Sequence, residues 1–255
     1  MNIPVLKTVF GLLFASSVMA QDAGTVNVDS EAALSTASSL DFGSMPASTE
    51  IRQMKQWVTD SGDNGRLPFI LVDKVNARVY VFNSAGQLQG MAAALLGMAR
   101  GDHSPPDIGD RSLSEVAVQD RITPAGRFVS SLSYDMNDKQ ILVVDDAQAL
   151  SLHAVVKGIP AERRAERLQS DTPLDNRISF GCINVPVQFF KNIVSPAFTR
   201  TNGIVYILPE TSSLDTLFGT RKLRNNVSGT QPSPNPLLTS SGTGTLQNSV
   251  SGMNR

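Results

Sequence analysis

The sequence is poor in the residue types that build disulfide frameworks and metal centres. Its 255 residues include one cysteine, Cys182, and two histidines, His103 and His153. A single cysteine has no disulfide partner within the chain. A zinc site with the usual nitrogen and sulfur ligands would have to recruit carboxylates, and no ligand-like spacing is visible. We therefore predict no metal and no other cofactor.

A strong excess of charge is also lacking. The formal net charge is −1 at pH 7, which gives no basic footprint for nucleic acid or for an anionic lipid surface. We predict no nucleic-acid partner, and the sequence leaves protein partners unknown. The length suffices for one substantial domain with its own core, plus extensions.

The start of the chain carries a targeting signal. Lys7 precedes the apolar run Val9–Ala20, and Val18-Met19-Ala20 supplies a small-residue cleavage site. The run is short for a membrane span, so residues 1–20 are interpreted as a cleaved signal peptide and not as a membrane anchor. We expect an exported protein of the periplasm or cell envelope. An uncleaved membrane helix is the alternative.

Composition divides the rest of the chain into four parts. Residues 21–47 are rich in Ser, Ala, Asp and Gly and are predicted to be a flexible leader. Residues 48–66 hold a short helix, with Ser48 or Thr49 as its N-cap, and a linker. Residues 67–210 form the main domain. Residues 211–255, rich in Ser, Thr, Gly, Asn and Pro, are predicted to be a disordered tail.

The main domain has the pattern of a mostly β protein with a few short helices. A hairpin around Asn76-Ala77 is predicted, and the run Gln87–Leu96 is compatible with strand or helix. A turn at Thr123–Phe128 feeds a strand that continues through Ser131. The other predicted strands are Phe69–Val75, Arg78–Phe82, Lys139–Val144 and Gly203–Leu208, and the predicted helices are Ala161–Gln169 and Val187–Phe198.

The only cysteine lies in a polar turn, Arg177–Asn184. Gly181 permits backbone angles that a Cβ would forbid, so the neighbouring Cys182 can be presented. Pro186 suits the first turn of a helix, which would place the thiol just before a helix N-terminus and lower its pKa. In an oxidising compartment a lone cysteine indicates a reactive thiol or an intermolecular bridge. A small buried apolar residue is the alternative.

A thiol nucleophile needs a general base, and histidine suits that role near neutral pH. His153 lies in the apolar stretch Ser151–Val155, typical of a strand end, whereas His103 lies in the loop Gly101–Arg111 and is expected to be solvated. The alternative for His153 is a core histidine bonded to the backbone. Spacing along the chain does not fix a contact between His153 and Cys182.

These residues resemble the YkuD-type L,D-transpeptidase family. The resemblance rests on His153, on Ser179-Phe180-Gly181-Cys182-Ile183-Asn184 and on the upstream Thr123-Pro124-Ala125-Gly126-Arg127-Phe128, and it covers roughly Leu67–Pro209. It implies a β-sandwich-like catalytic domain, export, and peptidoglycan stem peptides as substrates. By the same resemblance, Cys182 is the nucleophile and His153 its base, oriented by the carbonyl of Ala154.

The resemblance also implies a reaction. Cys182 would form a thioester with a tetrapeptide stem, and an amine of a second stem would resolve it into an L,D-crosslink. Backbone N–H groups around Gly181 and Cys182 would stabilise the oxyanion, supported by Ser179. Asn184, Arg177 and Phe180 are the expected substrate-binding residues. Arg177 would pair with a stem carboxylate, or else be a solvated loop arginine.

Two features depart from the family pattern. Phe180 stands where the family usually carries histidine, which removes a donor and adds apolar bulk. The segment between His153 and Cys182 is long, and its helix Ala161–Gln169 is predicted to form a lid. Three alternatives stay open: water as the acceptor, which gives a carboxypeptidase or endopeptidase; a catalytically silent envelope protein that binds peptidoglycan or a partner; and a cysteine hydrolase acting on other amide bonds.

Overall fold

The computed structural model describes residue 42 and residues 45–220. The predicted signal peptide, most of the predicted leader and the tail beyond residue 220 lie outside the described residues. None of the helices in the described ranges is long and apolar enough to cross a bilayer.

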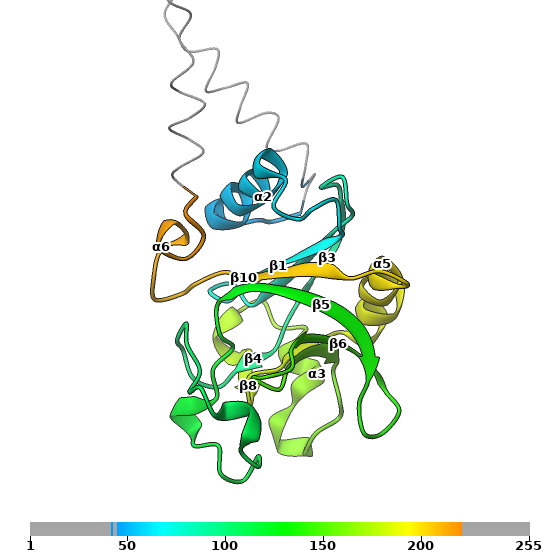
Figure 1. Ribbon diagram of the computed structural model, residues 1–255. Helices are drawn as coiled ribbons and strands as arrows, with labels where there is room; N and C mark the ends of the chain where they lie inside the picture. The colour runs from blue at the N-terminus through cyan, green and yellow to red at the C-terminus, as the bar shows by residue number, and fades with distance from the viewer. Residues whose placement is uncertain (1–41, 43–44, 221–255) are drawn as a thin grey trace, which may run out of the picture. The chain divides into compact units, whose positions relative to one another are not determined.

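The domain is built on one eight-stranded sheet with the order β3-β2-β1-β10-β5-β6-β7-β9 (Figure 1). Only the β1–β10 and β7–β9 pairs are parallel within it. A small parallel pair, β4–β8, lies beside it. The strands are β1 (Phe69–Asp73), β2 (Arg78–Phe82), β3 (Leu88–Ala93), β4 (Leu96–Gly97), β5 (Gly126–Tyr134), β6 (Gln140–Asp145), β7 (Leu150–Ala154), β8 (Arg177–Ser179), β9 (Ile183–Val185) and β10 (Gly203–Ile207).

The long strand β5 divides the sheet into two halves. Its first part, through Ser130, pairs with β10, and its second part, from Ser131, pairs with β6. The strand is strongly curved along its length (Figure 1). Buried residues of both halves form one core cluster, including Ile70, Val205 and Leu152. Leu95 bridges to Asn184 of β9, so the sheet nearly closes. The predicted mostly β, sandwich-like fold with few helices is confirmed.

Helices cover the outer face of the first half. Helix α2 (Thr49–Ser61) is capped by the Ser48 hydroxyl, which accepts a hydrogen bond from the Ile51 N–H at 3.2 Å. Its buried face packs on β1 (Figure 1). Trp57 meets Tyr206 edge to face, with ring centroids 6.4 Å apart, so it packs against the outer face of β10, opposite Val205 and Ile207 of the core cluster. Apolar contacts on both faces explain why every residue of β1 is buried.

The predicted helix Val187–Phe198 is confirmed. It consists of α4 (Val187–Phe189), the π-helical turn η5 (Phe190–Val194) and α5 (Ser195–Phe198). Phe190, Val194 and Phe198, four residues apart, enter the core. The predicted helix Ala161–Gln169 is shorter than expected, because only η3 (Pro160–Glu162) and α3 (Arg164–Arg167) form there, followed by η4 (Pro173–Asp175).

Other predicted elements are corrected in detail. The hairpin of β1 and β2 turns through four residues, 74–77, and not through Asn76-Ala77 alone. Gln87–Leu96 resolves into β3 and β4, with no helix. Short 3-10 turns, η1 (Ile108–Asp110) and η2 (Val118–Asp120), interrupt the loop before β5.

The predicted tail begins too early in the sequence. Thr211 and Ser212 donate four hydrogen bonds to the Asp102 carboxylate, through both backbone N–H groups and both hydroxyls. Helix α6 (Leu214–Phe218) follows, and Phe218 contacts Trp57 and Tyr206. The composition of this segment predicts that it cannot offset the entropy cost of ordering. These hydrogen bonds and aromatic contacts with distant residues offset that cost.

Asp102 belongs to a buried charge cluster that ties β1, β8 and the segment after β10 together. Its carboxylate accepts from Lys74 Nζ at 2.8 Å, and both side chains are at most 1% exposed. Glu210, also 1% exposed, pairs with Arg177 at 2.6 Å. Burial raises the pKa of Asp102, but the Lys74 ammonium and the donors of Thr211, Glu210 and Ser212 outweigh it and hold that pKa well below its usual range.

Removing one partner of this cluster is expected to destabilise the fold. Lys74→Met leaves the buried Asp102 charge without its cation, whereas Glu210 keeps Arg177, and the loss costs about 3–5 kcal/mol in the free energy of unfolding. Arg100→Met is the matched control: its side chain is 58% exposed and 3.7 Å from Glu210, so its effect stays within about 1 kcal/mol. Urea denaturation measures both, and equal effects would contradict the prediction.

Candidate functional site

The pairing of β7 with β9 brings Cys182 and His153 together. The parallel register places Leu152 opposite Ile183 and His153 opposite Asn184. Leu152 and Ile183 are fully buried in the core. Because side chains alternate along a strand, Ser151, His153, Cys182 and Asn184 lie on the other face. Residues far apart in the sequence therefore form one site.

The thiol of Cys182 has two hydrogen-bond partners on the chain before and within β7. The Ser151 hydroxyl donates to Sγ at 3.4 Å, and Sγ lies 3.5 Å from the Ala149 carbonyl. Burial alone would raise the pKa of this thiol. Interactions with the His153 imidazole and with Ser151 outweigh burial, and they lower the pKa of Cys182 below its ordinary value. The side chain is partly exposed, so the sulfur is not sealed in the core.

The imidazole of His153 has a fixed orientation. Its Nδ1 lies 2.9 Å from the Ala154 carbonyl oxygen, which can only accept, so Nδ1 carries the proton. Nε2 is then the ring nitrogen left to interact with the Cys182 thiol. Burial lowers the pKa of His153, but the Cys182 sulfur and the Ala154 carbonyl outweigh burial and raise it. The two shifts have opposite directions, and each favours the charged form of its own group.

The turn that carries Cys182 is fastened by the upstream Thr-Pro motif. Gly181 has φ +140°, and a Cβ there would lie 2.8 Å from the Ile122 carbonyl oxygen, so only glycine fits. The Thr123 hydroxyl donates to the Gly181 carbonyl at 2.7 Å and accepts from the Gly97 N–H at 2.8 Å. The motif therefore positions Gly181, the residue before Cys182.

The predicted effect of a helix N-terminus on Cys182 is wrong. Strand β9 and Pro186 separate the thiol from the helix, which begins at Val187. Ile183 and Val185 are buried in the core and pair with β7, so the residues after Cys182 extend as a strand. His153 and Ser151 lower the pKa of the thiol instead.

A predicted oxyanion group, Gly181, and a predicted substrate-binding residue, Asn184, have partners within the protein. The Gly181 N–H donates to the Ser179 hydroxyl at 3.1 Å, so it does not point toward an oxyanion in this conformation. Asn184 is 1% exposed; its Nδ2 donates to the Cys182 carbonyl at 3.1 Å, and its Oδ1 accepts from Arg164 Nη1 at 2.9 Å. Asn184 therefore holds the backbone of Cys182 and is buried, so the predicted substrate contact is not open to it in this conformation.

Arg177 is likewise committed to the interior. Its guanidinium donates to both carboxylate oxygens of Glu210, at 3.1 and 2.6 Å, and to the Lys74 carbonyl at 2.7 Å. Neither predicted alternative, substrate contact or a solvated loop arginine, describes it. Phe180 is partly exposed and lies beneath the Arg121 guanidinium. His103 is exposed in its loop and makes no side-chain hydrogen bond with the described residues.

The long segment between His153 and Cys182 reaches the site through Arg164, which the sequence analysis missed. Arg164 donates to Asn184 and to Glu162 Oε2, the latter at 2.7 Å. Arg167 bonds the carbonyls of Glu162 and Asp175. A hollow of about 560 Å³ opens between this segment and the chain around it, with Val155, Val156 and Val187 in its wall. Only the fold reveals this contact, since no local motif surrounds Arg164.

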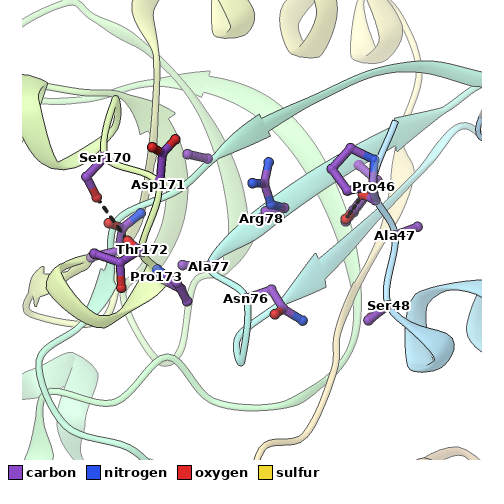
Figure 2. A pocket seen from close by; sticks show the side chains of 13 residues that line it. Pro46, Ala47, Ser48, Asn76, Ala77, Arg78, Ser170, Asp171, Thr172 and Pro173 are labelled. Carbon is purple, nitrogen blue, oxygen red and sulfur yellow. Dashed lines mark hydrogen bonds between the residues drawn. The ribbon is translucent and has the colours of Figure 1, made fainter. Parts of the chain in front are cut away.

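A second hollow, of about 350 Å³, is separate from the candidate residues. Figure 2 shows Arg78 of β2 lying in it between Pro46 and the loop of Asp171. None of the predicted site residues lines it. Within residues 42 and 45–220, no cluster of three His, Cys, Asp or Glu side chains is arranged to hold a metal ion.

Comparisons with known proteins give structural neighbours only. No protein-family model matches the chain, and no curated protein matches it. The fold is similar to the NMR structure of the catalytic domain from an E. faecium L,D-transpeptidase, at 17% identity and a TM-score of 0.32, covering 55% of this chain and 95% of that one.

Two crystal structures are similar over longer stretches. The helical cell shape determining protein Pgp2 from Campylobacter jejuni is 13% identical, with a TM-score of 0.36, and the match covers 63% of this chain and 57% of that one. An L,D-transpeptidase from Xylanimonas cellulosilytica is 11% identical, with a TM-score of 0.34 and coverage of 67% and 76%. These identities and TM-scores carry no argument about activity, which must come from the residues of this chain.

The pair of pKa shifts predicts how Cys182 reacts with iodoacetamide. Because the pKa of Cys182 is lowered, its alkylation rate should stay high as pH falls from 8.5 to 7, where an unperturbed thiol with a pKa of about 8.5 loses most of its thiolate. His153→Ala removes the main group that lowers this pKa, so the rate at pH 7 should fall about tenfold and the midpoint should move up. His103→Ala, at the exposed loop histidine, is the control and should match the wild type. An unshifted midpoint in His153→Ala would contradict the pairing.

The Thr123 hydroxyl is predicted to matter for the geometry of the nucleophile. Thr123→Val keeps the volume but leaves the Gly97 N–H and the Gly181 carbonyl without their buried partner, a cost of about 1–3 kcal/mol per group. We expect lower stability and slower alkylation of Cys182. Thr123→Ser retains the hydroxyl and should restore the alkylation rate. Unfolding curves and alkylation rates that are alike for the two variants would count against this role.

Proposed function

We propose that the chain is an exported cysteine acyltransferase that forms L,D-peptide crosslinks on peptidoglycan tetrapeptide stems. The observation that carries the proposal is the His153–Cys182 pair, held by neighbouring parallel strands with the thiol pKa lowered and the imidazole pKa raised. The motif resemblance of the sequence supports the substrate class. The proposed signal peptide, residues 1–20, places the protein in the periplasm or cell envelope.

The first half of the reaction uses the thiolate and the imidazolium in turn. The Cys182 thiolate attacks the carbonyl carbon of the third stem residue, and the carbonyl oxygen takes the negative charge. The C–N bond to the terminal D-alanine then breaks as His153 Nε2 gives its proton to the departing amine. The products are free D-alanine, a thioester on Cys182 and a neutral imidazole.

The second half reverses these roles. The neutral Nε2 of His153 takes a proton from the amine of a second stem as that amine attacks the thioester. The C–S bond breaks, the Cys182 thiolate leaves, and an amide crosslink forms. The hydrogen bond from Nδ1 to the Ala154 carbonyl keeps the same ring nitrogen facing the sulfur in both halves.

The oxyanion donor is proposed at one backbone group. Since the Gly181 N–H is bonded to Ser179, the N–H of Cys182 itself is the group we propose for the tetrahedral oxygen. A donor of this kind is worth about 3–4 kcal/mol of transition-state stabilisation. Asn184 and Thr123 act on the same turn from behind, through the carbonyls of Cys182 and Gly181.

The hollow beside residues 160–166 is proposed to take part of the stem peptide. It adjoins the site through Arg164, and its wall combines valines with the exposed Lys157 and Arg163. An apolar surface edged by cations suits a short peptide that carries carboxylates. The segment acts as a lid in this proposal, held at one end by the Arg164–Asn184 hydrogen bond.

Two other functions are compatible with this site. If water resolves the thioester, the protein is an L,D-carboxypeptidase or endopeptidase. If Phe180, in place of the histidine usual in the family, prevents acylation, the protein is a catalytically silent peptidoglycan-binding envelope protein. The first shares the thioester with the acyltransferase, and the second does not form it.

Intact-mass measurement after incubation with a tetrapeptide stem tests the proposal. The wild type is expected to gain the mass of the acylated tripeptide on Cys182, and Cys182→Ala is expected to gain nothing. His153→Ala should slow acylation at least about 100-fold, whereas His103→Ala should match the wild type. Product analysis with and without an added amine stem then separates transfer from hydrolysis. No mass gain with any stem, alongside fast iodoacetamide alkylation, would overturn the acyltransferase proposal.

A further inference from the structure

A cation lies on the residue that departs from the family pattern. The guanidinium carbon of Arg121 lies 3.9 Å from the centroid of the Phe180 ring. Phe180 is two positions before Cys182, and both aromatic ring and guanidinium are partly exposed. A guanidinium stacked on an aromatic face is held by the ring quadrupole and keeps its edge available for hydrogen bonds.

The backbone fixes Arg121 relative to the nucleophile turn. The Arg121 carbonyl accepts from the Ala99 N–H at 2.9 Å, and its Nε donates to the Val116 carbonyl at 3.2 Å. The next residue, Ile122, places its carbonyl against Gly181. Arg121 therefore has a defined position beside the turn of Cys182. Only its Nε is used in the hydrogen bond to Val116, so its two terminal nitrogens can still donate to a ligand.

The charge of Arg121 has no carboxylate partner among the described residues. The nearest acids along the chain are already paired: Arg111 binds Asp107 and Asp120, each at 2.8 Å. Glu115 accepts from the N–H and hydroxyl of Ser112. Asp107 and Asp120 are thus held by another arginine and Glu115 by a serine, and among the described residues Arg121 has no carboxylate within ion-pair distance.

We propose that Arg121, stacked on Phe180, binds the terminal carboxylate of the D-alanine that the reaction releases. This rests on the proposed function. The carboxylate is separated from the scissile nitrogen by a single carbon, so a group bound at Phe180 lies within the reach of the scissile bond. A planar guanidinium edge matches a carboxylate with two parallel hydrogen bonds. The site then selects stems that end in a free D-alanine over amide bonds inside a longer chain.

A pair of matched substrates tests this carboxylate site. The probes are a tetrapeptide stem that ends in D-alanine and the same stem ending in D-alaninamide. Arg121→Gln should lower kcat/KM for the acid about 10- to 100-fold, and for the amide less than about threefold. Arg121→Lys should lower kcat/KM for the acid less than Arg121→Gln does, since lysine keeps the positive charge but lacks the planar guanidinium that binds both carboxylate oxygens. Phe180→Leu keeps apolar bulk without a π face and should also reduce the preference for the acid.

Arg100→Gln is the matched control, because its side chain is 58% exposed and belongs to no part of the site. It should leave the preference for acid over amide unchanged. Equal losses on acid and amide in Arg121→Gln, with wild-type alkylation of Cys182, would overturn the inference. If Arg121→Gln fails to fold, Arg121→Lys and Phe180→Leu with the same two stems carry the test.

Binding to a variant that cannot react separates this inference from the proposed function. In Cys182→Ala, calorimetry should show tighter binding of the acid than of the amide, and Arg121→Gln should abolish the difference. If the wild type forms no thioester but this difference is present, the acyltransferase proposal fails and the carboxylate site stands. If the wild type forms a thioester but acid and amide bind alike, the carboxylate site fails alone.

Discussion

The register of one parallel strand pair fixes the chemistry of this protein. Leu152 and Ile183 face each other in the core, and this apolar contact places Ser151, His153 and Cys182 on the opposite face. A slip of one residue in either strand would turn a charged or polar side chain into the core and take His153 away from the sulfur. The same packing that stabilises the sheet therefore sets the geometry of the Cys182 thiol and the His153 imidazole.

Much of the fold could be predicted from the sequence, because its signals are local. The β-branched runs of β1, β2 and β10 indicate strands, and apolar residues four apart indicate the helix from Val187. The end of the domain could not be predicted in this way. Thr211 and Ser212 bind Asp102, which lies more than one hundred positions earlier. Composition indicates how much apolar surface a segment can bury. It does not indicate that a distant carboxylate, here Asp102, accepts the segment's hydrogen bonds in the folded protein.

In the candidate site, too, the local patterns could be predicted from the sequence, whereas the contacts between distant residues could not. The turn of Cys182 and the strand-end histidine were visible as local patterns, but their contact was implied only by the family resemblance. The lowered thiol pKa was predicted for the wrong reason, since buried Ile183 and Val185 extend the chain as a strand before the helix begins. The sequence left Arg177 open between a substrate contact and a solvated loop arginine, whereas Glu210, distant in sequence, holds it in the interior. Arg121 and Arg164 carry no local signal at all.

The distribution of charge around the turn follows from the cost of burial. Lys74 and Arg177 lie in the interior, and each is paired with a carboxylate that is at most 1% exposed, because an unpaired buried charge costs several kcal/mol. Arg164 has a side chain that is 12% exposed, and it is paired with Glu162. Arg121, which is partly exposed and rests on an aromatic ring, can stay unpaired among the described residues because water still reaches it. A cation without an ion-pair partner among the described residues is thus tolerated beside the turn of Cys182, at the place proposed for a substrate carboxylate.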